Sequence, residues 1–329
     1  NNNIVILSSR GILSYSEVES KLNKLIQIKN NIEDFIGMKQ FKKENWFSIK
    51  DIKILDDVIY ISYTEEIKKN CFNTGVIYGT FNYDNIQFRK LFSPIECLHI
   101  NGGEDKEFNG HSSGGRIIPY NNDLLLTVGD YRRRNLAQDK QSTIGKIIKI
   151  KPFKSNSFEV ISIGHRNPQG LLYDSDRNFL ISTEHGPKGG DEINIISIDN
   201  VENYGWPISS YGDHYSEYLK TTYASVAPLN KSHSEYGFVE PIFYFTYEEI
   251  NSNGFSQIIS NYFDSTSDFF VTSLNGRTIY NLQVTNGPIK LTQFIQTGER
   301  IRDIIFVESK KLYILLQEDT PKLSLLIDR

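Results

Sequence analysis

Residues 49–65 read IKDIKILDDVIYISYTE. One apolar run leads into an Asp-Asp turn and a second apolar run leaves it, which is typical of a β-hairpin. The same pattern returns at GGRIIPYNNDLLLTVGD (114–130), GLLYDSDRNFLISTEHG (170–186) and IRDIIFVESKKLYILLQE (301–318). A looser copy turns at 265–268 before FFVTSLNG, and the chain opens on half a copy, NNNIVILSSRG. The sequence therefore repeats one supersecondary unit six times.

The spacing of these units predicts the fold. Their turns fall near residues 2, 57, 122, 176, 267 and 310. Such intervals suit the ~40–50-residue repeats of propellers once loop insertions are allowed. We therefore predict an all-β chain, a six-bladed β-propeller of four-stranded antiparallel blades, in a single domain over 1–329. The first blade is expected to lack a strand unless another segment closes the ring, and a pair of β-sandwiches is the alternative fold.

Two segments interrupt the repeats. Ser16 and Glu19 form a capping box before apolar residues at helical spacing, which predicts a short inserted helix at about 16–30. The stretch at about 207–240 has few apolar runs and is predicted to be a long loop excursion. Loops on one face of a propeller commonly carry its site.

Composition supports strands and narrows the classes of partner. Aromatic residues make up 12% of the chain, and alanine occurs three times, which favours strands over helices. The net charge of −4 gives no electrostatic case for nucleic-acid binding. No apolar run reaches the eighteen residues of a membrane span, and no signal peptide is visible at a start that lacks Met and suggests trimming. Cys71 and Cys97 could pair or stay free.

Two loops concentrate residues that can do chemistry: GHRNPQG (164–170) and EHGPKGGDE (184–192). His111, His165 and His185 lie where strands meet loops, so they could converge at one mouth, although a lone histidine is more often structural. Asp191 and Glu192 could bind calcium through carboxylate oxygens, and an exposed charged turn is the alternative. The glycines lack the strand–loop–helix context of a nucleotide site.

These motifs resemble those of the soluble quinoprotein sugar dehydrogenases, the glucose/sorbosone and aldose dehydrogenases that use pyrroloquinoline quinone (PQQ). The resemblance rests on the two loops together with NYGWP (203–207), HSSGGRI (111–117), LLLTVGD (124–130), STIGKIIKI (142–150) and GERIRDIIF (298–306), in the same order. It covers about residues 45–329 and implies a six-bladed propeller. It also implies a periplasmic or extracellular location, a sugar substrate and an external electron acceptor.

The resemblance assigns a role to each matching residue. His111 is implied as the general base for the anomeric hydroxyl, since an imidazole titrates near working pH. The implied cofactor-binding residues include Arg166 and Asn167. Arg166 also stabilises negative charge on the reduced quinone, and Asn167 braces the loop together with Gln169. Arg300 and Arg302 are implied to bind the carboxylates of the cofactor. The implied calcium ligands are the backbone oxygens of Gly186 and Pro187 for a cofactor calcium, and Asp191, Glu192 and Tyr204 for a structural calcium.

Three departures from the family pattern leave two functions open. Asn275 stands where the family has a quinone-contacting lysine, and Trp46 aligns with a cofactor-contacting glutamine. YEEINSNG (247–254) replaces a pocket segment and adds Glu248 and Glu249. One hypothesis is a divergent PQQ- and calcium-dependent oxidoreductase that oxidises an aldose or oligosaccharide by hydride transfer. The other is a non-catalytic calcium-stabilised propeller that binds a glycan or a protein.

Overall fold

The computed structural model describes residues 3–17, 24–102, 107–152, 154, 156–214, 231–249, 251, 253–263, 267–284 and 287–328. Contacts divide the chain into two compact units. The first comprises Asn1–Arg133 with Gln141–Val160, and the second Arg134–Lys140 with Ile161–Arg329. Each unit is described by itself, and the single domain over 1–329 stays a prediction.

The first unit is built from antiparallel meanders. The strands of its first sheet are β1 (Asn3–Leu7), β2 (Leu13–Glu17) and β3 (Ile26–Gln27). The next sheet has the order β10 (Leu98–His99), β7 (Cys71–Thr80), β6 (Val58–Lys68) and β5 (Ile49–Leu55), with β9 (Arg89–Phe92) also on β7. A third meander consists of β11 (Gly114–Tyr120), β12 (Asp123–Val128) and β13 (Lys146–Ile150). The remaining elements are the parallel pair β4 (Lys29–Asn30) and β8 (Asn85–Ile86), and helix α1 (Met38–Lys43).

The second unit continues the series. The end of β14 (Phe158–Ile163) pairs in parallel with β18 (Glu202–Asn203). One four-stranded sheet has the order β15 (Pro168–Asp174), β16 (Phe179–Glu184), β17 (Glu192–Ile196) and β19 (Phe243–Tyr244). The next contains β20 (Phe255–Ser260), β21 (Phe269–Ser273), β22 (Thr278–Gln283) and β23 (Lys290–Gln296). The last contains β24 (Ile301–Val307), β25 (Leu312–Gln317) and β26 (Lys322–Ile327).

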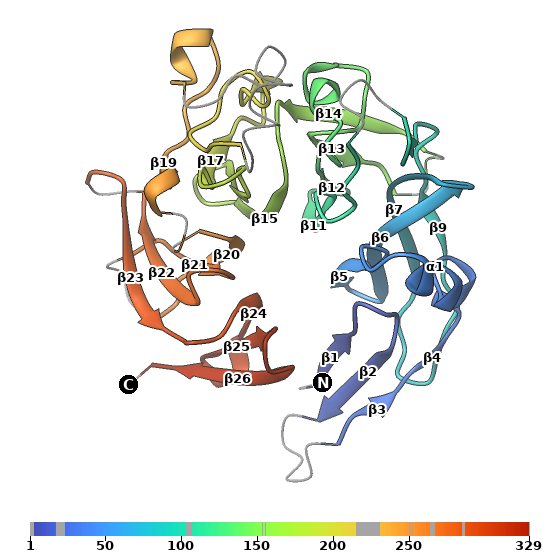
Figure 1. Ribbon diagram of the computed structural model, residues 1–329. Coiled ribbons are helices and arrows are strands. Elements are labelled where there is room, and N and C mark those ends of the chain that lie inside the picture. The colour runs from blue at the N-terminus through green and yellow to red at the C-terminus, as the bar shows by residue number, and fades with distance from the viewer. Residues whose placement is uncertain are drawn as a thin grey trace. The chain divides into compact units, whose positions relative to one another are not determined.

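Figure 1 shows these sheets succeeding one another along the chain, from blue to red. The hairpins β5–β6, β11–β12, β15–β16, β20–β21 and β24–β25 fall where the sequence predicts them. The predicted fold class, an all-β six-bladed β-propeller, is confirmed. In the described part of the chain, the first sheet and the last sheet each have three strands. The missing strand of the first blade stays a prediction.

The predicted helix at about 16–30 is wrong wherever the chain is described, and residues 18–23 lie outside the described residues. Strand β2 runs through Glu17 and pairs with β1, so that Leu13 is buried in the core. Residues 26–27 form β3 on the other side of β2. Strand pairing overrides the local capping pattern here, and the one α-helix in the described residues is α1. In the predicted loop excursion, the described residues form the 3-10 turn Ser234–Tyr236 and an isolated bridge from Asp213 to Lys188.

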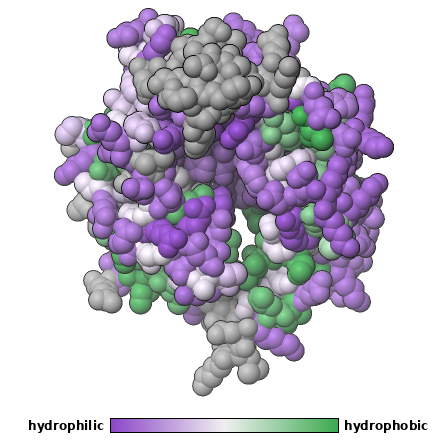
Figure 2. Space-filling model, viewed as in Figure 1, coloured by the Kyte–Doolittle hydropathy of each residue, from purple (hydrophilic) through white to green (hydrophobic). Residues whose placement is uncertain are grey.

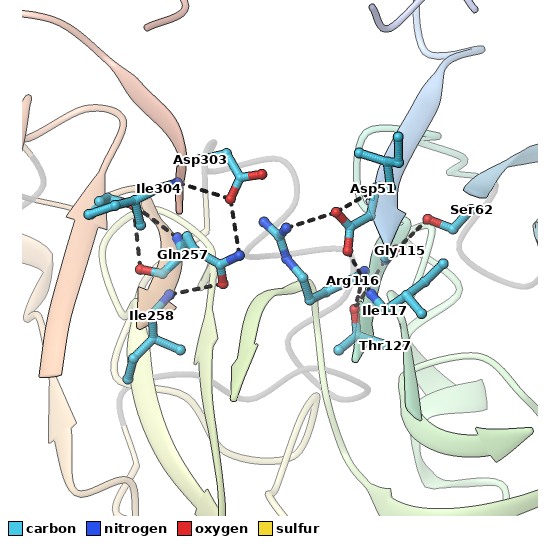
Figure 3. A network of polar contacts seen from close by, with 12 residues as sticks. Asp51, Ser62, Gly115, Arg116, Ile117, Thr127, Gln257, Ile258, Asp303 and Ile304 are labelled. Carbon is cyan, nitrogen blue, oxygen red and sulfur yellow. Dashed lines mark hydrogen bonds and ion pairs between the residues drawn. The ribbon is translucent and has the colours of Figure 1, made fainter. Parts of the chain in front are cut away.

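A β-bulge recurs on the first strand of these hairpins. The pairing register shifts between Ile49 and Asp51 in β5 and between Ile301 and Asp303 in β24. Figure 3 shows the aspartate after each bulge: Asp51 accepts hydrogen bonds from Arg116 at 2.9 Å and from the Ile117 N–H at 2.8 Å, within the first unit.

Asp303 likewise accepts from Gln257 Nε2 at 3.1 Å within the second unit (Figure 3). Each aspartate therefore ties one hairpin to the next. A bulge changes the direction of the side chain that it carries, and Arg302 occupies the bulge of β24.

Buried aliphatic and aromatic side chains fill each unit. Phe47, Phe72 and Ile61 are among the core of the first, and Phe255, Phe269 and Ile193 among that of the second. Cys71 and Cys97 form a disulfide, which settles the pairing that the sequence left open. The face in Figure 2 is mostly hydrophilic, with scattered apolar side chains. Within the described residues, no helix has the length and apolarity needed to span a membrane.

Candidate active site

The two polar loops pack against each other in the second unit, and we call them the loop pair (residues 164–169 and 185–191). The N–H of His185 donates to the Asn167 carbonyl at 3.1 Å, and Gln169 Nε2 donates to Asn167 Oδ1 at 3.0 Å. Gly190 is required in the second loop, because its φ is +69° and a Cβ there would lie 2.2 Å from the Gly212 nitrogen. The glycines therefore permit a close packing that fixes the loops.

Arg166 is the cation of the loop pair, with 8% of its surface exposed. Its Nη1 donates to the His185 carbonyl at 2.9 Å and to the Gly186 carbonyl. The guanidinium carbon also lies 5.5 Å from the centre of the Trp206 ring, within reach of a cation–π interaction. Arg166 is thus held in one orientation, with its charge at the end of the first loop.

Asp191 is a buried brace. Its Oδ1 accepts from the Gly186 N–H at 3.0 Å, and its Oδ2 accepts from Gly254 and Phe255 at 2.6 and 3.0 Å. Burial raises the pKa of this carboxyl to about 7, although the three N–H groups and Arg166 oppose the shift. Asp191 joins the second loop to β20, 64 residues further along the chain.

Residues of the loop pair line a small, partly open cavity with a volume of about 10 Å³. Glu184 and Glu192 line it as cross-strand partners on β16 and β17, with 4% and 7% of their surfaces exposed. Burial, together with the charge of Glu184, raises the pKa of Glu192. Burial disfavours the charged form of both carboxylates, and a cation beside Glu192 would offset this cost.

His233 and Ser209 complete the lining of the cavity, each 1% exposed. His233 Nε2 lies 3.3 Å from Glu192 Oε1. Burial lowers the pKa of His233, but the neighbouring Glu192 outweighs it and the net shift is upward. His233 Nδ1 and the Ser209 hydroxyl have no hydrogen-bond partner within the described part of the chain, so two buried polar atoms with unused bonding capacity belong to residues that line the cavity.

His165 is structural. Its ring, fully buried, bridges Ser162 Oγ at 2.7 Å and Glu184 Oε2 at 2.8 Å, and it stacks on Tyr204. The order Ser–His–Glu copies a nucleophilic triad, but Ser162 is itself 0% exposed. No substrate can reach that hydroxyl, so the trio fixes Glu184 instead of performing chemistry.

Arg300 and Arg302 form a second cationic feature, which we call the arginine clamp together with the acid between them. Arg302 donates to Glu318 Oε2 from Nε at 2.9 Å and from Nη2 at 2.5 Å. Arg300 Nε lies 3.6 Å from Glu318 Oε1. Between 31% and 40% of each side chain in the clamp is exposed.

The pKa of His185 is affected by the charges of these arginines and of Arg166. Burial, together with the charges of Arg302, Arg166 and Arg300, lowers its pKa to about 3, although a hydrogen bond to the Phe255 backbone opposes the shift. Its Nε2 is buried and has no partner among the described residues. The charges of the three arginines therefore all disfavour protonation of the His185 ring.

The remaining predicted residues are His111, Asn275 and Tyr204, and Tyr204 also lines the cavity. His111 is exposed in the first unit, just before β11, with its N–H on Asn109 Oδ1. Asn275 is exposed after β21 and donates to Asn253 Oδ1 at 3.1 Å. The Tyr204 hydroxyl donates to the Ile195 carbonyl at 2.8 Å. In the described part of the chain, no three His, Cys, Asp or Glu side chains form a metal-binding group.

A sequence model of the family described as Glucose / Sorbosone dehydrogenase matches residues 51–325. The chain belongs to this family. It is 29% identical over 284 residues to aldose sugar dehydrogenase YliI of Escherichia coli K12, which covers 80% of this chain and 71% of that protein. It is 31% identical over 152 residues to quinoprotein glucose dehydrogenase B of Acinetobacter calcoaceticus, which covers 37% of this chain and 30% of that one.

Solved structures in the family share the fold. The apo form of the soluble E. coli aldose sugar dehydrogenase has a TM-score of 0.73 at 21% identity, over 99% of this chain and 92% of that one. The PQQ-bound aldose sugar dehydrogenase of Streptomyces coelicolor has a TM-score of 0.68 at 17% identity, over 98% and 90%. At these identities the likeness establishes architecture alone.

Sequence reasoning about this family member missed Glu184, His233 and Glu318. Glu184 stands beside His185 in the quoted loop, but its pairing with Glu192 appears only once the register of β16 and β17 is known. His233 comes from the long excursion, 41 residues after Glu192, and no local pattern marks it. Glu318 ends a quoted hairpin, so the hairpin register was the available signal.

Proposed function

We propose that the chain is a PQQ-dependent oxidoreductase that oxidises an aldose or oligosaccharide at its anomeric carbon. The observation that carries the proposal is a set of fixed arginine donors in the second unit: Arg166 is held by the loop carbonyls, and Arg300 and Arg302 both pair with the carboxylate of Glu318. PQQ bears three carboxylates, and arginine binds planar carboxylates through paired donors. The charge and chemistry of this region therefore fit the cofactor.

The protein residues have distinct tasks in this proposal. Arg300 and Arg302 hold carboxylates, and Arg166, fixed by the loop carbonyls, places a cation where negative charge develops on reduction. His111 takes the proton of the anomeric hydroxyl, a role that its exposure on a loop allows. When bound, the quinone supplies the acceptor for the hydride that leaves the sugar carbon.

Calcium fits one part of the region better than the predicted ligand set. The Gly186 carbonyl accepts from Arg166, both Asp191 oxygens accept backbone N–H groups, and the Tyr204 hydroxyl binds a carbonyl. Pro187 and Glu192 do line the cavity, beside Glu184. Both Glu184 oxygens also have hydrogen-bond partners, the Arg166 N–H and the His165 ring, so we place the proposed cation beside Glu192 and derive no catalytic step from it.

Calcium should stabilise the metal-stripped chain, because an ion that binds only the folded state adds about 2.7 kcal/mol at a hundredfold excess over Kd. Glu192→Gln should abolish this rise in Tm, whereas Glu235→Gln, at an exposed position, should keep it. Thermal unfolding with and without chelator makes the measurement. An equal Tm for the stripped and calcium-loaded wild-type chain would remove the cation from the proposal.

The proposed reaction predicts that His111→Ala abolishes dye-linked aldose oxidation after reconstitution but leaves quinone binding intact, because the base acts on the sugar. The loss should reach about 10²–10⁴-fold. His99→Ala, an exposed histidine of the same unit, is the control and should stay active. Oxidation by His111→Ala at the wild-type rate would contradict the assigned base.

A non-catalytic propeller that binds a glycan or a protein is the second candidate. Two observations favour it: Asn275 is engaged with Asn253, and Glu318 already pairs with both arginines of the clamp. Absence of PQQ binding in both the wild type and Asn275→Lys would support this candidate over the enzyme.

We place the protein in the periplasm or outside the cell. The disulfide between Cys71 and Cys97 suits an oxidising compartment, where such bonds persist. An external electron acceptor would then reoxidise the cofactor. Fractionation of cells that express the full protein tests this location, and a cytosolic signal would overturn it.

A further inference from the structure

Glu318 is held in the arginine clamp by the backbone as well as by its side chain. Its N–H donates to the Arg300 carbonyl at 2.9 Å, and the preceding Gln317 pairs with Ile301 across the β24–β25 ladder. The register thus places this acid between Arg300 and Arg302 whatever the rotamers of the two arginines. The position of Glu318 beside the two arginines is therefore set by the pairing of β24 with β25.

The acid occupies the donors that a ligand carboxylate would use. Arg302 directs two of its N–H groups, from Nε and Nη2, at the single oxygen Oε2 of Glu318, in a charge-assisted contact with a carboxylate. The clamp therefore already contains a carboxylate, one supplied by the chain.

The pairing is easily replaced. At least 31% of each of the three side chains is exposed, and exposed ion pairs contribute little to stability because water screens them. A ligand that brings more than one carboxylate to Arg300 and Arg302 gains contacts that Glu318 alone cannot match. Glu318 would then turn away at a small cost.

From this geometry we infer that Glu318 sets the affinity and charge preference of the anion site, by competing with ligand carboxylates for Arg300 and Arg302. The inference rests on the proposed PQQ site. It assigns Glu318 as a specificity-determining residue: the acid lowers the affinity for the cofactor and disfavours anions with a single carboxylate, which cannot replace it.

The test is titration of PQQ into the purified chain, followed by quenching of protein fluorescence, for wild type, Glu318→Gln and Asp319→Asn. Asp319 is the matched control, because it neighbours Glu318 and pairs with Arg277 outside the clamp. Both substitutions raise the net charge by one. Glu318→Gln should bind PQQ about two- to fivefold more tightly, the scale of an exposed ion pair, and Asp319→Asn should bind as the wild type does.

Each outcome decides the matter. Equal or weaker binding by Glu318→Gln beside a wild type that binds would overturn the role of Glu318 and leave the PQQ site standing. Equal tightening by both variants would also overturn it, since general charge would then explain the gain. No binding by any of the three proteins would overturn the PQQ site together with the inference. Glu318→Asp keeps the negative charge and should retain the wild-type affinity. It controls for a change in binding that comes from disturbing the fold at this position.

Discussion

The loop pair and the arginine clamp are both polar features of the second unit, but they are stabilised in opposite ways. In the loop pair, buried Asp191 accepts three backbone N–H groups and close-packed glycines leave no room for side chains. In the clamp, two partly exposed arginines meet one partly exposed glutamate. Buried polar groups are costly to leave unpaired, whereas exposed ion pairs are weak. The loop pair therefore serves as scaffold, and the clamp can exchange its partner for a ligand.

The largest effect should come from breaking the scaffold. Asp191→Ala leaves three N–H groups without acceptors, those of Gly186 and Phe255 buried and that of Gly254 partly buried, which should lower the free energy of unfolding by about 3 kcal/mol. Urea unfolding measures it, with the exposed Asp199→Ala as control at about 0.5 kcal/mol or less. A loss below about 1 kcal/mol for Asp191→Ala would show that the loop pair does not depend on this brace.

A smaller, pH-dependent effect should come from Glu240, which fastens the segment that carries His233. Burial would raise its pKa, but the Ser234 N–H and the Tyr211 and Ser232 hydroxyls outweigh it and lower the pKa from 4.5 to about 2. A carboxyl whose pKa is lower in the folded state than in the unfolded state stabilises the fold at pH values above the unfolded-state pKa. For Glu240 this contribution is lost as the pH falls from about 4.5 through about 2.

Glu240→Gln should therefore lose about 1–2 kcal/mol of stability at pH 7 relative to wild type. The gap between the two proteins should narrow as the pH falls toward 3, because the wild type then loses the same contribution. Urea unfolding across this range provides the measurement. A difference in stability between the two proteins that stays constant from pH 7 to pH 3 would contradict a lowered pKa for Glu240.

The smallest effect on stability should come from the clamp. Arg302→Ala removes an exposed ion pair, so the free energy of unfolding should change by less than about 1 kcal/mol. Arg277→Ala, which breaks the neighbouring exposed pair with Asp319, is the matched control and should behave alike. A loss as large as that of Asp191→Ala would erase the distinction between scaffold and clamp.

The hairpins could be predicted because alternating apolar residues and turn residues act locally, as in IKDIKILDDVIYISYTE. The partners of Asp191 could not, since Gly254 and Phe255 lie 63 and 64 residues away. The facing of Glu184 and Glu192 depends on one strand register, as does the position of Glu318. The helix prediction at about 16–30 was wrong in the described residues for a related reason. The end of β2 pairs with β1 there, and a local capping pattern carries no information about that strand pairing.

The central claim is that Arg166, Arg300 and Arg302 form one anion site for PQQ, and titration of PQQ into the wild type and Arg302→Ala tests it most directly. The wild type should bind one PQQ, and Arg302→Ala should bind it about 10- to 100-fold more weakly, as expected for the loss of a charge-assisted hydrogen bond of about 1.5–3 kcal/mol. Arg277→Ala should bind as the wild type does. Equal affinity in wild type and Arg302→Ala, or no binding by the wild type, would contradict the claim.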